Sequence, residues 1–196
     1  TDVDDFSVTY GEKRDGVELT TRLYTFAFYP HRTGVHKIPK ITVHVKFRSE
    51  GGSPHNYPMA TKPFEISAKL PPGAEKTSTL ISTTGLEIKQ TWQPDLNKAK
   101  SGDAVTRRIH FKAPNVMGMG FPPVIPERVE GAAIYPETPE VSDKVYRGDI
   151  QGERIETFVY VFETEGTVTL PEMTFTWFDT EANQLKRIEL PAKTVT

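Results

Sequence analysis

Histidines are the first residues to examine for chemistry, because their side chains bind metals and transfer protons near neutral pH. The chain has five histidines, namely His31, His36, His44, His55 and His110. A zinc site needs three or four converging ligands, usually with one closely spaced pair. His44 and His110 alternate with apolar residues in segments typical of strands, so we expect their side chains to face water. We therefore predict no metal site.

Acidic segments are the second candidates for metal binding. Residues 2–5 contain Asp2, Asp4 and Asp5, and residues 149–153 contain Asp149 and Glu153. Such carboxylates could donate oxygens to Ca²⁺, but neither segment has the ligand spacing of a calcium-binding loop. We interpret both segments as solvated turns.

Catalytic signatures are missing from the sequence. The chain contains no cysteine, which excludes thiol catalysis, disulfides and thiolate metal sites. It has no phosphate-binding glycine loop, paired-histidine zinc motif or serine elbow. Gly118-Met119-Gly120 has the start of a dinucleotide-binding motif, but Pro122 and Pro123 follow where a helix must begin. We expect no catalytic residues, no cofactor and no enzymatic activity.

The segment 115–123 is a candidate interaction loop. Met117, Met119 and Phe121 lie among glycines, and flexible methionines suit adaptable recognition surfaces. The alternative, which we rank first, is that the three side chains cap one end of a core.

Alternation of apolar and polar residues predicts the elements that carry these candidates. It indicates strands over 41–48, 86–92, 108–112 and 173–177, while the continuously apolar segment 158–162 indicates a central strand covered on both faces. No helical periodicity of ten or more residues is present, so we predict an all-β fold. Trp92, Phe111, Phe175 and Trp177 are the predicted core, although the two tryptophans could instead stack on a sugar.

The predicted domain organisation rests on a linker and an internal repeat. Leu70-Pro71-Pro72-Gly73 and the Ser/Thr-rich run after it predict a linker over 73–84, between units 1–72 and 85–196. A shift of 132 positions superimposes a shared hairpin pattern without a gap. Its turn and strand markers are Gly34 and Pro39 in the first copy, and Gly166 and Pro171 in the second.

The two units differ in what precedes this hairpin. About 65 residues precede it in the second unit and only about 20 in the first. We therefore expect the second unit to be a complete β-sandwich and the first to be the C-terminal part of one, or a small one, with an exposed sheet edge.

Charge excludes one class of partner. The chain has 24 basic and 26 acidic residues, a net charge of −2 and no basic stripe. Nucleic-acid binding normally requires such a stripe, so we expect none. The longest apolar runs are far shorter than a membrane-spanning helix, so any membrane anchor would lie outside this sequence.

Several motifs in the second unit resemble the repeated unit of the BatD family, bacterial proteins of the aerotolerance operon that are also called oxygen-tolerance proteins. These motifs are Thr91-Trp92-Gln93-Pro94-Asp95, Lys100-Ser101-Gly102-Asp103-Ala104-Val105-Thr106-Arg107, Phe121-Pro122-Pro123, Ala133-Ile134-Tyr135-Pro136, Gly152-Glu153-Arg154, Gly166-Thr167-Val168-Thr169-Leu170-Pro171 and Leu190-Pro191-Ala192. Gly34-Val35-His36-Lys37-Ile38-Pro39 is similar to the preceding repeat of that family.

The resemblance implies tandem immunoglobulin-like β-sandwiches in the periplasm, anchored to the inner membrane by a helix outside this sequence. It also implies protein partners, namely membrane proteins with von Willebrand A domains and a MoxR-type ATPase from the same operon. It brings no catalytic residue. The expected function is therefore that of a non-enzymatic scaffold or protein-interaction module of a membrane-associated complex. The alternative is a carbohydrate-binding sandwich of the cell envelope.

Overall fold

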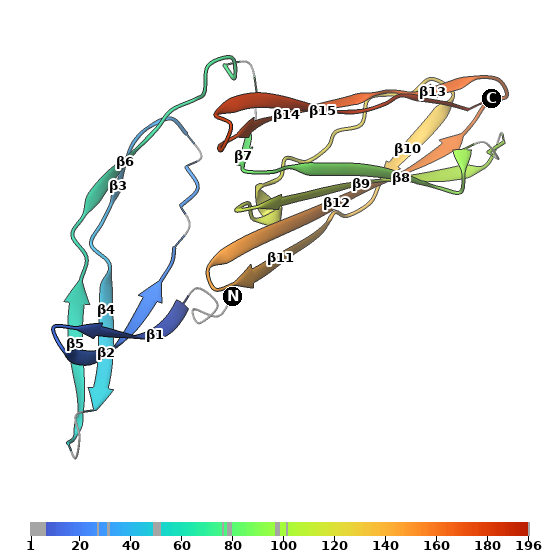
Figure 1. The fold of residues 1–196 in the computed structure, drawn as a ribbon. Coiled ribbons are helices and arrows are strands. Elements are labelled where there is room, and N and C mark those ends of the chain that lie inside the picture. Colours follow the sequence, from blue (N-terminus) through green and yellow to red (C-terminus); the bar gives the residue numbers. More distant parts are fainter. Residues whose placement is uncertain are drawn as a thin grey trace. The chain divides into compact units, whose positions relative to one another are not determined.

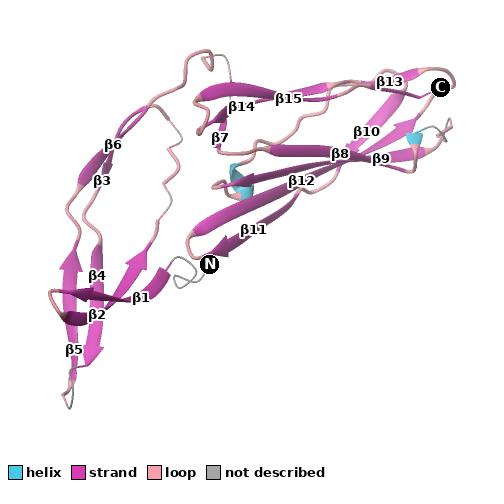
Figure 2. Ribbon diagram, in the orientation of Figure 1, coloured by secondary structure: helices cyan, strands magenta, loops and turns pink. Residues whose placement is uncertain are grey.

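The computed structural model describes residues 7–26, 28–30, 32–48, 52–75, 77, 80–96, 99–100 and 102–195. Strands make up nearly all of their regular structure, and helical segments are short (Figure 2). This confirms the all-β prediction. No helix among these residues is long and apolar enough to cross a membrane.

The chain divides into two compact units, Phe28–Pro72 and a larger unit that combines Thr1–Ala27 with Gly73–Thr196. This division differs from the expected one, because the first 27 residues group with the second unit rather than with 28–72. The expected linker 73–84 also contains a strand, β7 (Ile81–Thr83). Ile81 and Thr83 are buried, and the Thr83 hydroxyl donates to the carbonyl of Pro114 at 2.7 Å. The end of the expected linker is therefore part of the sandwich.

Two sheets face each other in the larger unit (Figure 1). The first sheet has the strand order β10-β12-β9-β8, and β11 also pairs with β12. The second has the order β15-β14-β7, and a separate pair joins β13 to β16. The strands not yet located are β8 (Glu87–Gln93), β9 (Ala104–Pro114), β10 (Ala132–Pro136), β11 (Glu140–Tyr146), β12 (Asp149–Phe162), β13 (Val168–Leu170), β14 (Met173–Asp179), β15 (Gln184–Leu190) and β16 (Lys193–Val195).

The core lies between these two sheets. Phe111 and Trp177 are buried within it, whereas Trp92 and Phe175 are half-buried and pack against it. The rings of Phe111 in β9 and Phe175 in β14 meet edge to face at 5.2 Å and so join the two layers. The four residues chosen as core from alternation alone therefore all contact the sandwich interior.

Strand β12 organises the first sheet. Its 14 residues pair with β9 on one side, and with β11 and then β10 on the other. The expected cover on both faces of residues 158–162 is incomplete, because Phe158, Tyr160 and Phe162 are buried on the core face, whereas Val159 and Val161 on the other face are half-buried. Phe158 and Tyr160 are fully buried, as a central strand requires.

The N-terminal hairpin consists of β1 (Ser7–Arg14) and β2 (Val17–Tyr24). Asp15 and Gly16 form its two-residue turn, with φ of 51° and 82°. Positive φ at both central positions is the geometry of a type I′ turn, whose twist matches that of the strands it joins. Arg147 and Gly148 form the same turn between β11 and β12, with φ of 52° and 91°.

The smaller unit is one long two-stranded ribbon, interrupted once. In it β3 (Gly34–Ile38) pairs with β6 (Phe64–Ala68), and β4 (Thr42–Arg48) pairs with β5 (Pro54–Ala60). We call these four strands, β3 to β6, the first ribbon. The second ribbon consists of the four strands β13 to β16 in the larger unit, where β13 pairs with β16 and β14 pairs with β15.

The two ribbons have the same register. The shift of 132 positions that aligns Gly34 with Gly166 takes β1, β2, β3 and β4 onto β11, β12, β13 and β14. A shift of 129 positions, which aligns Ile66 with Val195, takes β5 and β6 onto β15 and β16. Every strand pairing in the first copy then falls on a pairing in the second. Only the turn between the central strands differs in length.

The repeat markers lie at equivalent places. Gly34 and Gly166 have φ of 117° and 113°, a region that residues with a Cβ rarely adopt. Pro39 lies between β3 and β4, and Pro171 lies between β13 and β14. Proline has no N–H to continue a ladder, so each ribbon is interrupted there.

Candidate functional site

The segment between β9 and β10 is held tightly against the first sheet. Asn115, with φ of 57°, donates its N–H to the carbonyl of Ile150 at 2.7 Å. The N–H of Gly118 donates to Asp143 Oδ1 at 2.6 Å, at the start of a single helical turn, η3 (Gly118–Gly120). These two bonds join the first part of the loop to β12 and β11 of the first sheet.

Two glycines make this close approach possible. A Cβ added to Gly152 in β12 would lie 2.2 Å from the carbonyl oxygen of Val116 and 2.5 Å from the nitrogen of Gly118. A Cβ added to Gly118 would lie 2.6 Å from the Glu153 carbonyl oxygen. Both contacts are with backbone atoms, which cannot rotate away. The loop therefore depends on glycine on both sides of the contact.

The three predicted interaction residues have different surroundings. Phe121 is 2% exposed and packs against Phe111, with ring centroids 5.7 Å apart. Met117 is half-buried, and Met119 is 74% exposed. Phe121 thus caps the core, as the alternative interpretation proposed for all three, while Met119 is available to a partner.

A groove follows this loop along the edge of the second sheet. Residues 122–128 belong to no helix or strand, and their first part forms one wall. The first half of β14 forms the other wall, and the groove has a volume of about 580 Å³. The residues that line the groove are Thr77, Ile81, Pro122, Pro123, Val124, Ile125, Glu127, Pro171, Glu172, Met173, Thr174, Phe175 and Thr176.

One edge of β14 is only partly paired beside this groove. β15 pairs with β14 along its whole length, but β7 pairs with it, in parallel, only from Trp177 to Asp179. In the described ranges no strand pairs with Met173–Thr176 on the β7 side. An edge of this kind offers backbone N–H and C=O groups to an added strand.

The chemistry of the groove walls is mixed. Prolines 122 and 123, Val124 and Met173 are apolar, and Ile125 is 85% exposed. Glu127 and Glu172 add two carboxylates to the lining. The arrangement suits an extended peptide that has apolar side chains and at least one basic residue.

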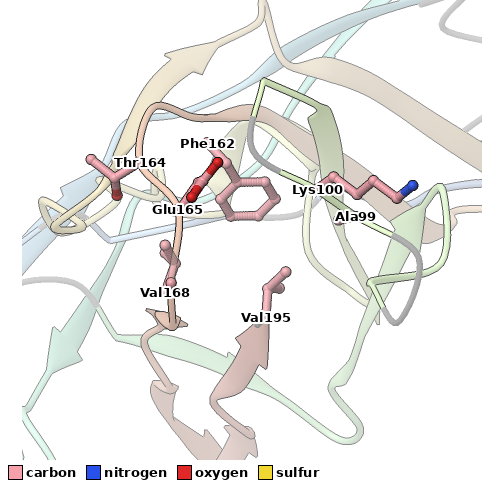
Figure 3. Close-up of a pocket in the computed structure, with 8 residues that line it drawn as sticks. Ala99, Lys100, Phe162, Thr164, Glu165, Val168 and Val195 are labelled. Carbon is pink, nitrogen blue, oxygen red and sulfur yellow. The ribbon is translucent and has the colours of Figure 1, made fainter.

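A second hollow lies at the opposite end of the second ribbon, beside Gly166 (Figure 3). Its volume is about 450 Å³, and Phe162, Val168 and Val195 supply most of its apolar lining. Lys100 and Glu165 also line it, but no ion pair joins them among the described contacts. Thr164 supplies a hydroxyl to the lining, but among the described contacts no hydrogen bond joins it to Lys100 or Glu165 as nucleophilic catalysis needs.

A polar cluster lies on the outer face of the first sheet. The Glu153 carboxylate accepts from His110 Nε2 at 3.1 Å and pairs with Lys112 Nζ at 3.4 Å and Lys144 Nζ at 3.5 Å. Partial burial raises the pKa of Glu153, but the Lys144 charge, the His110 hydrogen bond and Lys112 outweigh it and keep that pKa below its usual range. The cluster is an ion-pair network whose cations already share one carboxylate.

The metal candidates do not come together. No group of three His, Asp or Glu side chains in the described ranges could hold a metal ion. Asp149 begins the exposed start of β12, while His31 and residues 2–5 lie outside the described residues.

The two tryptophans lie inside the sandwich rather than on a flat surface. Trp177 is buried, and the guanidinium of Arg107 lies over the Trp92 ring, 4.9 Å from its centroid. Neither indole therefore presents an open face for stacking on a sugar.

Arg107 is a core residue that the sequence patterns above did not identify. It is fully buried in β9, where Nε and Nη2 donate to Gln90 Oε1 at 3.1 and 2.7 Å, and Nη1 donates to the Pro171 carbonyl at 3.4 Å. Gln90 Nε2 donates to the Pro191 carbonyl at 3.3 Å. Burial lowers the pKa of Arg107, against an opposing effect of Tyr160. Arg107 lies two residues from both Val105 and Ile109, so the strand alternation predicts that it shares their core face.

No family model, curated protein or solved structure matches this chain in the comparisons.

Proposed function

We propose that this chain is a non-enzymatic protein-interaction module that binds an extended peptide segment in the β14 groove. One observation carries the proposal: Met173–Thr176 form a sheet edge without a strand on the β7 side, and the wall from Pro122 to Ile125 lies beside it. Backbone hydrogen bonds to such an edge supply affinity, and side-chain pockets in the adjacent wall supply specificity.

The cellular setting that we propose comes from the motif resemblance. A scaffold of the BatD type would lie in the periplasm at the inner membrane and would contact membrane proteins with von Willebrand A domains. The groove chemistry favours a partner segment with alternating apolar residues and a basic residue opposite Glu127 or Glu172.

The carbohydrate-binding alternative has weaker support. The aromatic content and the acidic segments of the sequence motivate it, but Trp92 and Trp177 both pack against the sandwich core. A glycan array with and without Ca²⁺ tests it directly.

The peptide hypothesis is tested by titrating the full chain with a Val-Lys-Val-Lys-Val peptide and following the backbone amide resonances. We expect shifts confined to Val124, Ile125 and Glu127, which carry the amides of the wall, and to residues 173–176. Ile125→Asp places a charge on an exposed wall residue and should weaken binding about tenfold, the equivalent of about 1.4 kcal/mol. Tyr146→Asp, at an exposed position on β11, is the matched control and should leave affinity unchanged.

Shifts spread evenly over the chain, or equal losses in both variants, would contradict a groove site. The same titration with a purified von Willebrand A domain encoded in the same operon tests the proposed partner. Peptide binding without domain binding would retain the groove and reject that partner.

A further inference from the structure

The first ribbon has one apolar face and one polar face. Core-facing positions of the second ribbon correspond, by the two shifts, to residues on a single face of the first, which we call the apolar face. The opposite face contains Lys37, Lys46, Arg48 and Glu65. The apolar face also contains His36 and His55, which pair with Ile66 and Phe47. Its apolar residues are Ile38, Ile41, Val43, Val45, Phe47, Tyr57, Met59, Phe64 and Ile66.

Most of this apolar face is open to solvent. Phe47, Tyr57, Met59 and Phe64 are all at least half exposed, and Ile41 and Val45 are also exposed. Soluble monomers rarely leave a contiguous apolar surface of this kind uncovered unless it binds something.

The equivalent residues of the second ribbon are covered. Leu170, Trp177 and Leu190, which correspond to Ile38, Val45 and Thr61, are buried. The cover is the first sheet of the sandwich, where Phe111 in β9 contacts Phe175. A sheet like the first sheet of the sandwich therefore fits the core-facing side of a ribbon with this register.

Polar contacts add specificity to this cover. Pro171 and Pro191 lie on the two strands at the interruption of the second ribbon, where the ladder stops and carbonyls need other donors. Arg107 and Gln90 of the first sheet donate to these two carbonyls. The corresponding positions in the first ribbon are Pro39 and Lys62.

We propose that the apolar face of the first ribbon is a docking surface for a β-sheet segment of a partner polypeptide with the residue pattern of β8 and β9. That partner alternates apolar residues on one face, as Ile88, Ile109 and Phe111 do here. It also carries a buried Arg–Gln pair that donates to the carbonyls of Pro39 and Lys62. The surface shares no residue with the β14 groove, and its occupant is a folded sheet rather than a single extended peptide.

The test supplies the missing pattern from the chain itself. A copy of residues 73–138 is placed directly before Ser7 of the full chain, the spacing that the 132-position shift dictates. Amide hydrogen exchange of β3–β6 should slow by about tenfold or more, because docking adds a free energy of opening. Binding of a hydrophobic dye to the chain should fall at the same time.

The matched control carries Ile109→Asp and Phe111→Asp in the added copy alone, which leaves the original sandwich intact. Slow exchange with the unaltered copy and fast exchange with this control support the proposal. Equal exchange rates with the two copies would overturn it. A concentration-dependent dimer of the unmodified chain that protects β3–β6 would overturn it as well, because a second copy would then be the occupant.

Discussion

Two stretches of this molecule have the same strands and opposite environments. Residues 7–68 and 139–195 share strand order, register and the geometry of two turns. Phe26 and Phe158 occupy equivalent positions, yet Phe158 is 1% exposed and Phe26 is 64% exposed. Local sequence therefore determines the ribbon and its turns, whereas burial depends on whether a second sheet is present.

The presence of that sheet also changes the strands themselves. β12 continues to Phe162 because β9 and β10 pair with its second half. β2 ends at Tyr24, and the described residues that follow it form no strand before Gly34. Strand length in this repeat thus reflects available partners as well as propensity.

The largest effect should come from the equivalent phenylalanines. Phe158→Ala leaves a cavity in a fully buried site and should destabilise the sandwich by about 3–5 kcal/mol. Phe26→Ala removes an exposed side chain and should cost about 0.5 kcal/mol or less. Urea unfolding followed by tryptophan fluorescence measures this difference, because both tryptophans, Trp92 and Trp177, lie in the sandwich.

Similar costs for the two variants would mean that Phe26 is covered in solution. That result would remove the contrast between the repeats and would require a partner surface for the first. Phe28→Ala, at the position equivalent to buried Tyr160, provides an independent check of the same point.

The next effect concerns the position occupied by Thr20 in the first repeat and Gly152 in the second. Gly152→Thr should destabilise the sandwich by about 3 kcal/mol, because its Cβ overlaps the backbone of Val116 and Gly118. Thr20→Gly, the reverse exchange in an exposed strand, should cost about 1 kcal/mol or less in the N-terminal hairpin. Tryptophan fluorescence in urea reports the first change, and amide exchange of β1 and β2 reports the second.

A loss below about 1 kcal/mol for Gly152→Thr would show that the 115–121 loop can move away from β12. In that case Met117 and Phe121 would regain the adaptable role that their composition indicates.

The features that could be predicted from the sequence are those that depend on residues close together in the chain. Gly34, Pro39, Gly166 and Pro171 identify a turn and an interruption within one ribbon, so a pattern in the sequence was sufficient to find them. Alternation likewise selected Phe111 for the core.

The features that were missed depend on residues distant in sequence. The close packing of the 115–121 loop against β12 depends on Gly152, more than thirty positions away from Met119. The β14 groove exists because β7 begins only opposite Trp177, which leaves Met173–Thr176 unpaired on that side, and because residues 122–125 lie beside this edge. Arg107 could have been found from its phase between Val105 and Ile109, but its charge made a core position unexpected.

A smaller and equal effect is expected at the two turn glycines. Gly34→Val and Gly166→Val should each destabilise their own ribbon by about 1–2 kcal/mol, because both glycines have φ near 115°. Nothing lies within 4 Å of a Cβ added at either position, so backbone strain rather than crowding causes the loss. Amide exchange of β3 and β13 measures each effect separately.

Unequal losses of stability in the two variants would show that the packed sheet, and not only local backbone strain, determines the effect. A loss at Gly166 without a loss at Gly34 would indicate that the first ribbon relaxes its turn when no sheet packs against it. Gly34→Ala and Gly166→Ala are the matched smaller variants, which test whether side-chain size contributes.

The smallest expected effect is a dependence of stability on pH. It concerns Asp179 in the second ribbon, whose equivalent in the first ribbon, Phe47, has no titratable group. The N–H of Ala182 and then the Lys186 ammonium outweigh partial burial and lower the pKa of Asp179. A carboxyl whose pKa is lowered on folding stabilises the folded state above its unfolded pKa, and this contribution is lost as pH falls through the folded value. Stability of the sandwich should therefore decline from about pH 4 downward. Asp179→Asn should lower the urea midpoint at pH 7 and should narrow its gap to the wild type as the pH falls, whereas a gap that is constant with pH would show that Asp179 acts only through the shape of its turn.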